Sequence, residues 1–125
     1  MKFKTLMIIK AIVCLGFGLP IVIMPEFVYG IFGITLTAGG AFAAREYGAA
    51  MLGNLFVTWM ARNSIESEAR RAIITGMLVY NAVALIASVV TFLTGDFNLI
   101  AWLIVLIYLF FTIGFGYFSL KPPQP

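Results

Sequence analysis

The sequence predicts an all-α integral membrane protein, a bundle of four transmembrane helices with both termini in the cytoplasm. Hydrophobic residues make up 62% of the 125-residue chain and charged residues only 10%, too few to cover the core of a soluble domain. The apolar residues fall into four runs, each close to the ~20 residues that cross a hydrocarbon core. The whole chain, residues 1–125, is therefore expected to form a single transmembrane domain.

The four runs give the expected helices in chain order. They cover residues 6–24, 40–61, 72–93 and 99–120. At 1.5 Å per residue, each is about long enough for a hydrocarbon core of ~30 Å. Pro25 follows the first run and a proline-rich tail follows the last, and proline does not continue a helix.

The three connections between these helices differ in character. Residues 26–39 are apolar but interrupted by glycines, so they are too short to span and are expected in the membrane interface. Residues 62–71 are strongly charged and predict a solvated loop with local charge pairs. Residues 94–96, Thr-Gly-Asp, predict a tight turn that makes the last two helices a hairpin.

The distribution of charge predicts the orientation. The cations expected on one side are Lys2, Lys4, Lys10, Arg62, Arg70, Arg71 and Lys121. The loops of the other side contain only Glu26 and Asp96, so the positive-inside rule places the cationic side in the cytoplasm. A cleavable signal peptide over residues 1–30 is the rival interpretation, but no clean small-x-small cleavage site follows the first apolar run.

The residue types exclude several function classes. The chain has no histidine and one cysteine, Cys14, which excludes histidine-based metal sites, Ser-His-Asp and Cys-His catalysis, and an intrachain disulfide. We therefore expect no catalytic, cofactor or metal site and no enzyme activity. The net charge of +3 is explained by topology, so nucleic-acid binding is not expected.

Two charges lie inside the second expected helix. Arg45 and Glu46 follow its outer boundary by about one turn, and each costs about 2.5 to 3.5 kcal/mol on insertion scales unless it finds a partner or water. One interpretation makes them, with Tyr47, a ligand clamp or proton-relay pair at the mouth of an outward-facing pocket. In the other interpretation they are an interfacial pair. The long side chain of Arg45 then extends to the lipid headgroups, and Glu46 caps or pairs with a neighbouring helix.

A face of small residues accompanies Glu46. At 100° per residue, Glu46 shares a face with Ala49, Ala50, Gly53 and Val57. Small residues at spacings of three and four let another helix approach closely within a membrane. The predicted helix-packing residues are Gly48, Ala49 and Gly53. The residues left to face lipid are Met51, Leu55 and Trp59.

Two asparagines are expected at similar depth. Asn54 and Asn81 lie roughly 12 to 15 Å from the cytoplasmic boundary and predict a hydrogen bond between the second and third helices, with a typical value of ~0.6 kcal/mol. Replacing both by leucine without loss of stability in detergent would contradict this pairing. The alternative is a polar cavity whose lining also includes Tyr47, Thr58, Tyr80 and Ser88.

Short motifs resemble those of a group of uncharacterised bacterial four-helix membrane proteins. The matching features are Met24-Pro25-Glu26, Phe32-Gly33, the Arg-x-x-Gly start Arg45-Glu46-Tyr47-Gly48, then Gly53 and Ala61-Arg62. The resemblance covers most of the chain and implies the four-helix topology without a known activity. Small multidrug exporters are a different case, since their essential glutamate lies in the first helix, where this chain has no acidic residue.

Together these observations predict a multi-pass protein of the bacterial cytoplasmic (inner) membrane. Its expected role is that of a non-enzymatic accessory or scaffold subunit, which forms a homo-oligomer or joins a larger membrane complex, with membrane lipids around it. The alternative is a protein that binds or transports a small ligand, a lipid or an ion through an outward-facing site near Arg45 and Glu46.

Overall fold

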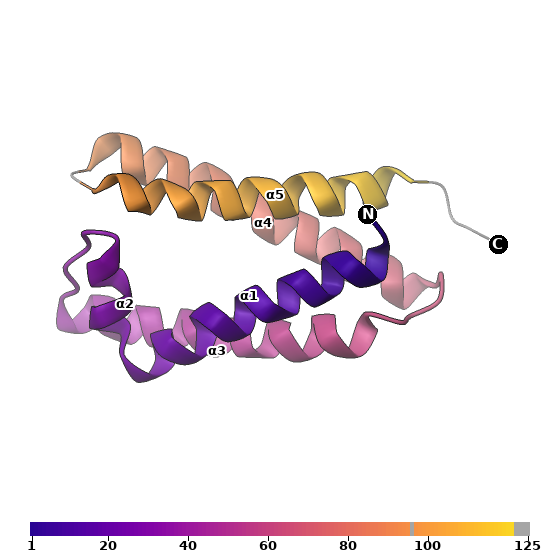
Figure 1. Cartoon of the computed structure of the whole chain (residues 1–125), viewed down its shortest axis with the longest axis horizontal. Helices are drawn as coiled ribbons and strands as arrows, with labels where there is room; N and C mark the ends of the chain where they lie inside the picture. The colour runs from indigo at the N-terminus through magenta and orange to yellow at the C-terminus, as the bar shows by residue number, and fades with distance from the viewer. Residues whose placement is uncertain (96, 122–125) are drawn as a thin grey trace. The chain divides into compact units, whose positions relative to one another are not determined.

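The computed structural model of the chain is all-α in the residues that it describes, 1–95 and 97–121 (Figure 1). Its helices are α1 (Phe3–Ile23), α2 (Pro25–Ile31), α3 (Ala38–Ala61), α4 (Glu68–Thr94), the short 3-10 helix η1 (Leu99–Ala101) and α5 (Trp102–Leu120). The predicted all-α class is confirmed. Asp96 and the proline-rich tail after Lys121 lie outside the described residues.

Three of the described helical segments are long and apolar enough to cross a membrane. They are α1, α4 and the continuous segment Leu99–Leu120. Helix α3 has 24 residues, but it does not belong to this set. Its sequence explains why, because Arg45, Glu46 and Asn54 interrupt a segment that is otherwise rich in alanine and glycine.

The chain divides into two compact units. Unit 1 runs from Met1 to Arg62 and contains α1, α2 and α3, while unit 2 begins at Asn63 and contains α4, η1 and α5. Each unit is built on a pair of long helices with one short helix, and we call it a helix pair. The single domain expected from the sequence stays a prediction.

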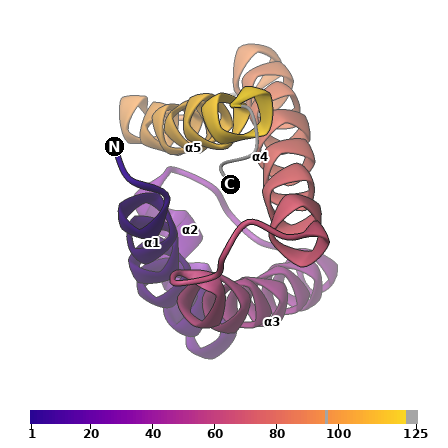
Figure 2. The ribbon, with the colours of Figure 1, turned by 90° about the vertical axis from the view of Figure 1, so that its right-hand side faces the viewer.

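In unit 1, α1 and α3 pack closely in antiparallel orientation (Figures 1 and 2). A Cβ atom built on Gly48 would lie 2.9 Å from the Gly18 carbonyl oxygen and 2.9 Å from Val22 Cγ2, so two backbones meet there. Met51 is buried on the same side of α3, next to Gly18. The expectation that Met51 faces lipid is therefore wrong, because the close approach at Gly48 turns this side of α3 towards α1.

In unit 2, α4 packs against α5 as a hairpin. Phe111 and Phe115 of α5 and Ile74 of α4 are fully buried, and Met77 of α4 is also buried. Asn98 begins the returning segment, since its side-chain oxygen accepts a hydrogen bond from Ala101 N (3.1 Å).

Helices α1, α3 and α4 begin earlier than the apolar runs suggest. Helix α4 starts at Glu68 because the hydroxyl of Ser67 accepts a hydrogen bond from Arg70 N (3.2 Å) and an acidic residue suits the first turn. Arg70 and Arg71 thus belong to a helix and not to a solvated loop. Helix α1 starts at Phe3, which places Lys10 two turns inside it with 2% of its surface exposed.

Candidate functional site

Arg45 of α3 reaches the end of α1. Its Nε donates a hydrogen bond to the carbonyl oxygen of Val22 (3.3 Å), one residue before the last residue of α1. Carbonyl groups in the last turn of a helix have no partner within that helix, and the negative end of the helix dipole favours a cation. Arg45 therefore stabilises the end of α1.

Glu46 is turned away from this contact. It is exposed, Tyr47 is half-buried and Gly48 is buried against α1. Successive residues of a helix point about 100° apart, so the guanidinium of Arg45 and the carboxylate of Glu46 lie in different surroundings.

Helix α3 consequently has two distinct faces. The buried face holds Ala41, Ala44, Gly48, Met51 and Thr58. The residues of the opposite face, Glu46, Ala49, Ala50, Gly53 and Val57, are all exposed, and we call this set the open face of α3. A Cβ atom on Gly53 would find nothing within 4 Å. The predicted packing residues are thus divided, with Gly48 inside unit 1 and Ala49 and Gly53 on the open face.

The two asparagines lie in different units. Asn54 of unit 1 is half-buried, and its backbone carbonyl accepts a hydrogen bond from Thr58 Oγ1 (2.8 Å). Asn81 of unit 2 is fully buried, and its Nδ2 donates to the Met77 carbonyl oxygen (2.7 Å). Close to Asn81 in sequence, Tyr80 packs edge-on against Tyr108 of α5 at 6.2 Å between ring centres. The hydrogen bond expected between Asn54 and Asn81 stays a prediction.

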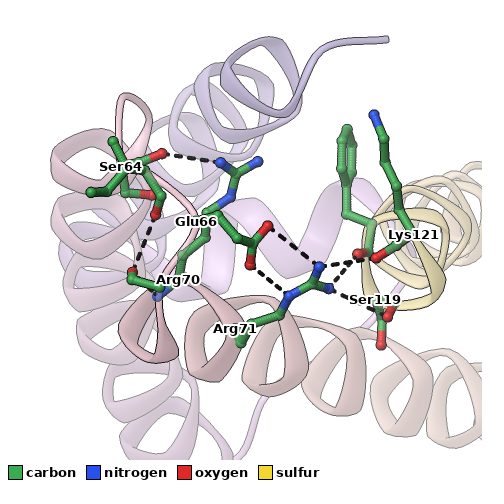
Figure 3. A network of polar contacts seen from close by, with 9 residues as sticks. Ser64, Glu66, Arg70, Arg71, Ser119 and Lys121 are labelled. Atoms are coloured by element: carbon green, nitrogen blue, oxygen red, sulfur yellow. Dashed lines mark hydrogen bonds and ion pairs between the residues drawn. The ribbon is translucent and has the colours of Figure 1, made fainter. Parts of the chain in front are cut away.

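Arg71 forms the densest polar network of the described residues (Figure 3). Its Nε and Nη2 donate to the two carboxylate oxygens of Glu66, at 2.7 and 3.3 Å. Its Nη1 donates to the carbonyl oxygens of Phe118 (3.0 Å) and Ser119 (3.5 Å), and Nη2 also donates to that of Lys121 (2.9 Å). These five contacts match the five N–H groups of a guanidinium.

The network is a structural joint between the start of α4 and the end of α5. Because every donor of Arg71 is used within unit 2, the guanidinium has none left for a ligand. Arg70 completes the corner, since its Nη1 donates to the Ser64 carbonyl oxygen (3.1 Å). The sequence does not predict this joint when the third helix is taken to begin at Ala72, the first residue of the apolar run. The N-cap signal Ser67-Glu68 would have indicated the earlier start.

Lys10 is a second residue whose placement differs from the expectation. It lies four residues before Cys14 on the buried face of α1, where both side chains are almost fully covered. The sequence places Lys10 only among the cations expected on the cytoplasmic side. In the described residues, no group of three or more cysteine, aspartate or glutamate side chains is arranged to hold a metal ion.

The family assignment follows from sequence comparison. Residues 8–123 match the family described as a domain of unknown function, DUF8292. The chain belongs to the DUF8292 family. No curated protein and no solved structure matches the chain. The DUF8292 match runs from within α1 to beyond α5, so it covers the residues of both helix pairs and of the joint at Arg71 in this chain. Membership in a family of unknown function agrees with the expected resemblance to uncharacterised proteins.

Proposed function

We propose that this DUF8292 protein is a non-enzymatic, multi-pass protein of the bacterial cytoplasmic membrane, with four crossing helices and both termini in the cytoplasm. Three helical segments are apolar enough to cross, which supports membrane association. For α3 the support is indirect. Helix α3 is about 36 Å long at 1.5 Å per residue, longer than a hydrocarbon core of ~30 Å. Arg45, one of its two charged residues, contacts the Val22 carbonyl oxygen.

We further propose that the protein acts as an accessory or scaffold subunit that joins a larger membrane assembly through the open face of α3. The observation that carries this proposal is the division of α3 into two faces. Gly48 serves the contact with α1, while Ala49, Ala50 and Gly53 remain exposed beside Glu46. A carboxylate exposed on a membrane helix is costly, and a partner helix that supplies a hydrogen-bond donor removes this cost.

The charge on this face favours a different protein over a second copy. Two copies with one membrane orientation are related by an axis along the membrane normal, so their α3 helices run parallel. A symmetric contact would then bring Glu46 near its own counterpart, and like charges repel. A partner with a cation or an amide at this depth avoids the repulsion.

The test compares substitutions on the two sides of unit 1. Gly53→Leu should lower the association constant for the larger assembly by roughly tenfold, as expected for a loss of ~1.4 kcal/mol of packing. Gly16→Leu is the matched control, since Gly16 is also exposed with nothing within 4 Å of a built Cβ. Assembly is measured on native gels of gently solubilised membranes, and thermal stability is measured in parallel. An unchanged assembly for Gly53→Leu contradicts the scaffold proposal.

The substitution Glu46→Gln distinguishes a different protein from a second copy of this chain as the partner. It should weaken assembly with a cationic partner, whereas it should strengthen self-association because it removes a repulsion. Co-purification of two differently tagged copies reports the second case.

The alternative function, an outward-facing site for a small ligand, a lipid or an ion near Arg45, Glu46 and Tyr47, has less support. The Arg45 guanidinium already contacts the Val22 carbonyl oxygen, and Glu46 points elsewhere. Loss of an activity in Arg45→Ala or Glu46→Gln without loss of stability would favour this alternative.

A further inference from the structure

One end of unit 1 gathers cationic residues from both of its long helices. Because α1 and α3 are antiparallel, α1 begins where α3 ends, and Figure 2 looks onto this end. Lys2 precedes α1, Lys4 lies in its first turn and Arg62 follows α3. Lys2 and Lys4 are exposed. We call these three residues the cationic end of unit 1.

No carboxylate of unit 1 balances these charges. Residues 1–62, all of which the structure describes, contain two acidic residues, Glu26 and Glu46. Glu26 lies in α2, directly after the end of α1, and Glu46 lies in the first half of α3. Both therefore belong to the opposite half of the helix pair.

Unit 2 provides the contrast. There Arg71 forms an ion pair with Glu66 (2.7 Å) and uses its remaining donors on the end of α5. The side chain of Lys121 lies over the rings of Tyr117 and Phe118, 5.8 Å from each ring centre. The charges of Arg71 and Lys121 thus serve the fold of unit 2, whereas Lys2 and Lys4 are exposed to solvent.

Arg62 and Trp59 mark the level of this end relative to a bilayer. The guanidinium of Arg62 lies 3.9 Å from the centre of the Trp59 ring, and its Nη1 donates to the Trp59 carbonyl oxygen. Trp59 is 46% exposed and the neighbouring Met60 is 76% exposed. An exposed indole beside a cation, next to an exposed apolar side chain, is typical of the boundary between headgroups and acyl chains.

We infer that the cationic end of unit 1 binds the headgroups of anionic phospholipids and gives the protein a preference for them over zwitterionic lipids. The inference rests on the membrane placement proposed above. A cation near the surface of an anionic membrane contributes an attraction that corresponds to about a five-fold change in affinity. Loss of Lys2 and Lys4 together should therefore reduce the preference by roughly 25-fold.

The experiment uses the full chain in two kinds of vesicle, one of phosphatidylcholine alone and one in which part of it is replaced by phosphatidylglycerol. Lipids that stay bound after gentle extraction are counted by native mass spectrometry. The variants are Lys2→Gln/Lys4→Gln, the charge-preserving Lys2→Arg/Lys4→Arg, and Lys121→Gln as a control that removes a cation of unit 2. We expect phosphatidylglycerol to be retained by the wild type, by the arginine variant and by Lys121→Gln, and to be lost in the double glutamine variant.

Four outcomes overturn the inference, and the last of them also contradicts the proposed function. Equal retention of both lipids by the wild type, or an unchanged preference in the double glutamine variant, removes the lipid site while leaving the membrane placement intact. A preference lost equally in Lys121→Gln shows an effect of total charge and not of this end. Failure of the wild type to insert into either vesicle contradicts the membrane placement itself.

Discussion

Two arginines in this protein act on the ends of neighbouring helices. Arg45 of α3 donates to Val22 at the end of α1, and Arg71 of α4 donates to the carbonyl groups at the end of α5. In an antiparallel pair, the early turns of one helix lie beside the last turn of the other. An arginine placed there meets unsatisfied carbonyl groups and the negative end of the helix dipole.

The number of hydrogen bonds that each arginine donates predicts how much it contributes to the free energy of unfolding. Arg71→Gln should lower the free energy of unfolding by about 2 kcal/mol, since hydrogen bonds to a charged group are worth ~1.5 to 3 kcal/mol. Arg71→Lys should restore little of this loss, because a single ammonium cannot reach Glu66 and the end of α5 in the planar arrangement of a guanidinium. Reversible unfolding in mixed micelles measures both changes.

Arg45→Gln is the comparison for this prediction. Arg45 is exposed and donates to Val22 at 3.3 Å, so its replacement should cost less than half as much as that of Arg71. Equal losses at the two positions would contradict the explanation from the number of bonds.

At the scale of the element, α3 combines two surfaces of opposite character. Its small residues lie on both sides, but Gly48 contacts the backbone of α1 while Gly53 has open space around it. The periodicity of small residues predicts that α3 associates closely with other helices. It does not assign each glycine to the internal or the external contact.

Alanine substitutions should therefore have opposite signs at the two glycines. Gly48→Ala places a methyl group 2.9 Å from the Gly18 carbonyl oxygen, and such overpacking costs roughly 1 to 3 kcal/mol. Gly53→Ala meets nothing within 4 Å and should stabilise the helix by up to about 1 kcal/mol, because alanine loses less backbone entropy than glycine. Thermal unfolding in detergent measures both. A destabilised Gly53→Ala variant would show that its surroundings are not open.

At the scale of the whole molecule, two helix pairs are joined by a short charged segment. Three helical segments have the composition of membrane spans, and α3 decides the number of crossings. If α3 crosses, the segments before and after it lie on opposite sides of the membrane.

Labelling of single cysteines tests this topology. With Cys14 replaced by alanine, Thr35→Cys and Asn98→Cys should react with a membrane-impermeant maleimide in intact cells, because four crossings place both outside. Ser67→Cys should react only after the cells are permeabilised. All three positions are exposed on the chain, so access to the reagent is limited by the membrane. Labelling of Ser67→Cys in intact cells would contradict the orientation.

The sequence by itself determined the all-α class and the approximate positions of the long helices, because apolar runs of this length have few other ways to satisfy their backbone in a membrane. It also marked α3 as the unusual helix, since Arg45 and Glu46 are conspicuous in an apolar context. It did not predict the short helix α2 or the early start of α4. The tertiary structure decided which side of α3 meets α1, as the burial of Met51 shows, because a helix with small residues all round offers no single apolar stripe. It also decided the roles of Arg71 and Lys10. Arg71 contacts Phe118, which is far from it in the chain, and the position of Lys10 within α1 depends on where that helix begins. The periodicity of apolar residues predicts neither a distant contact nor the exact start of a helix.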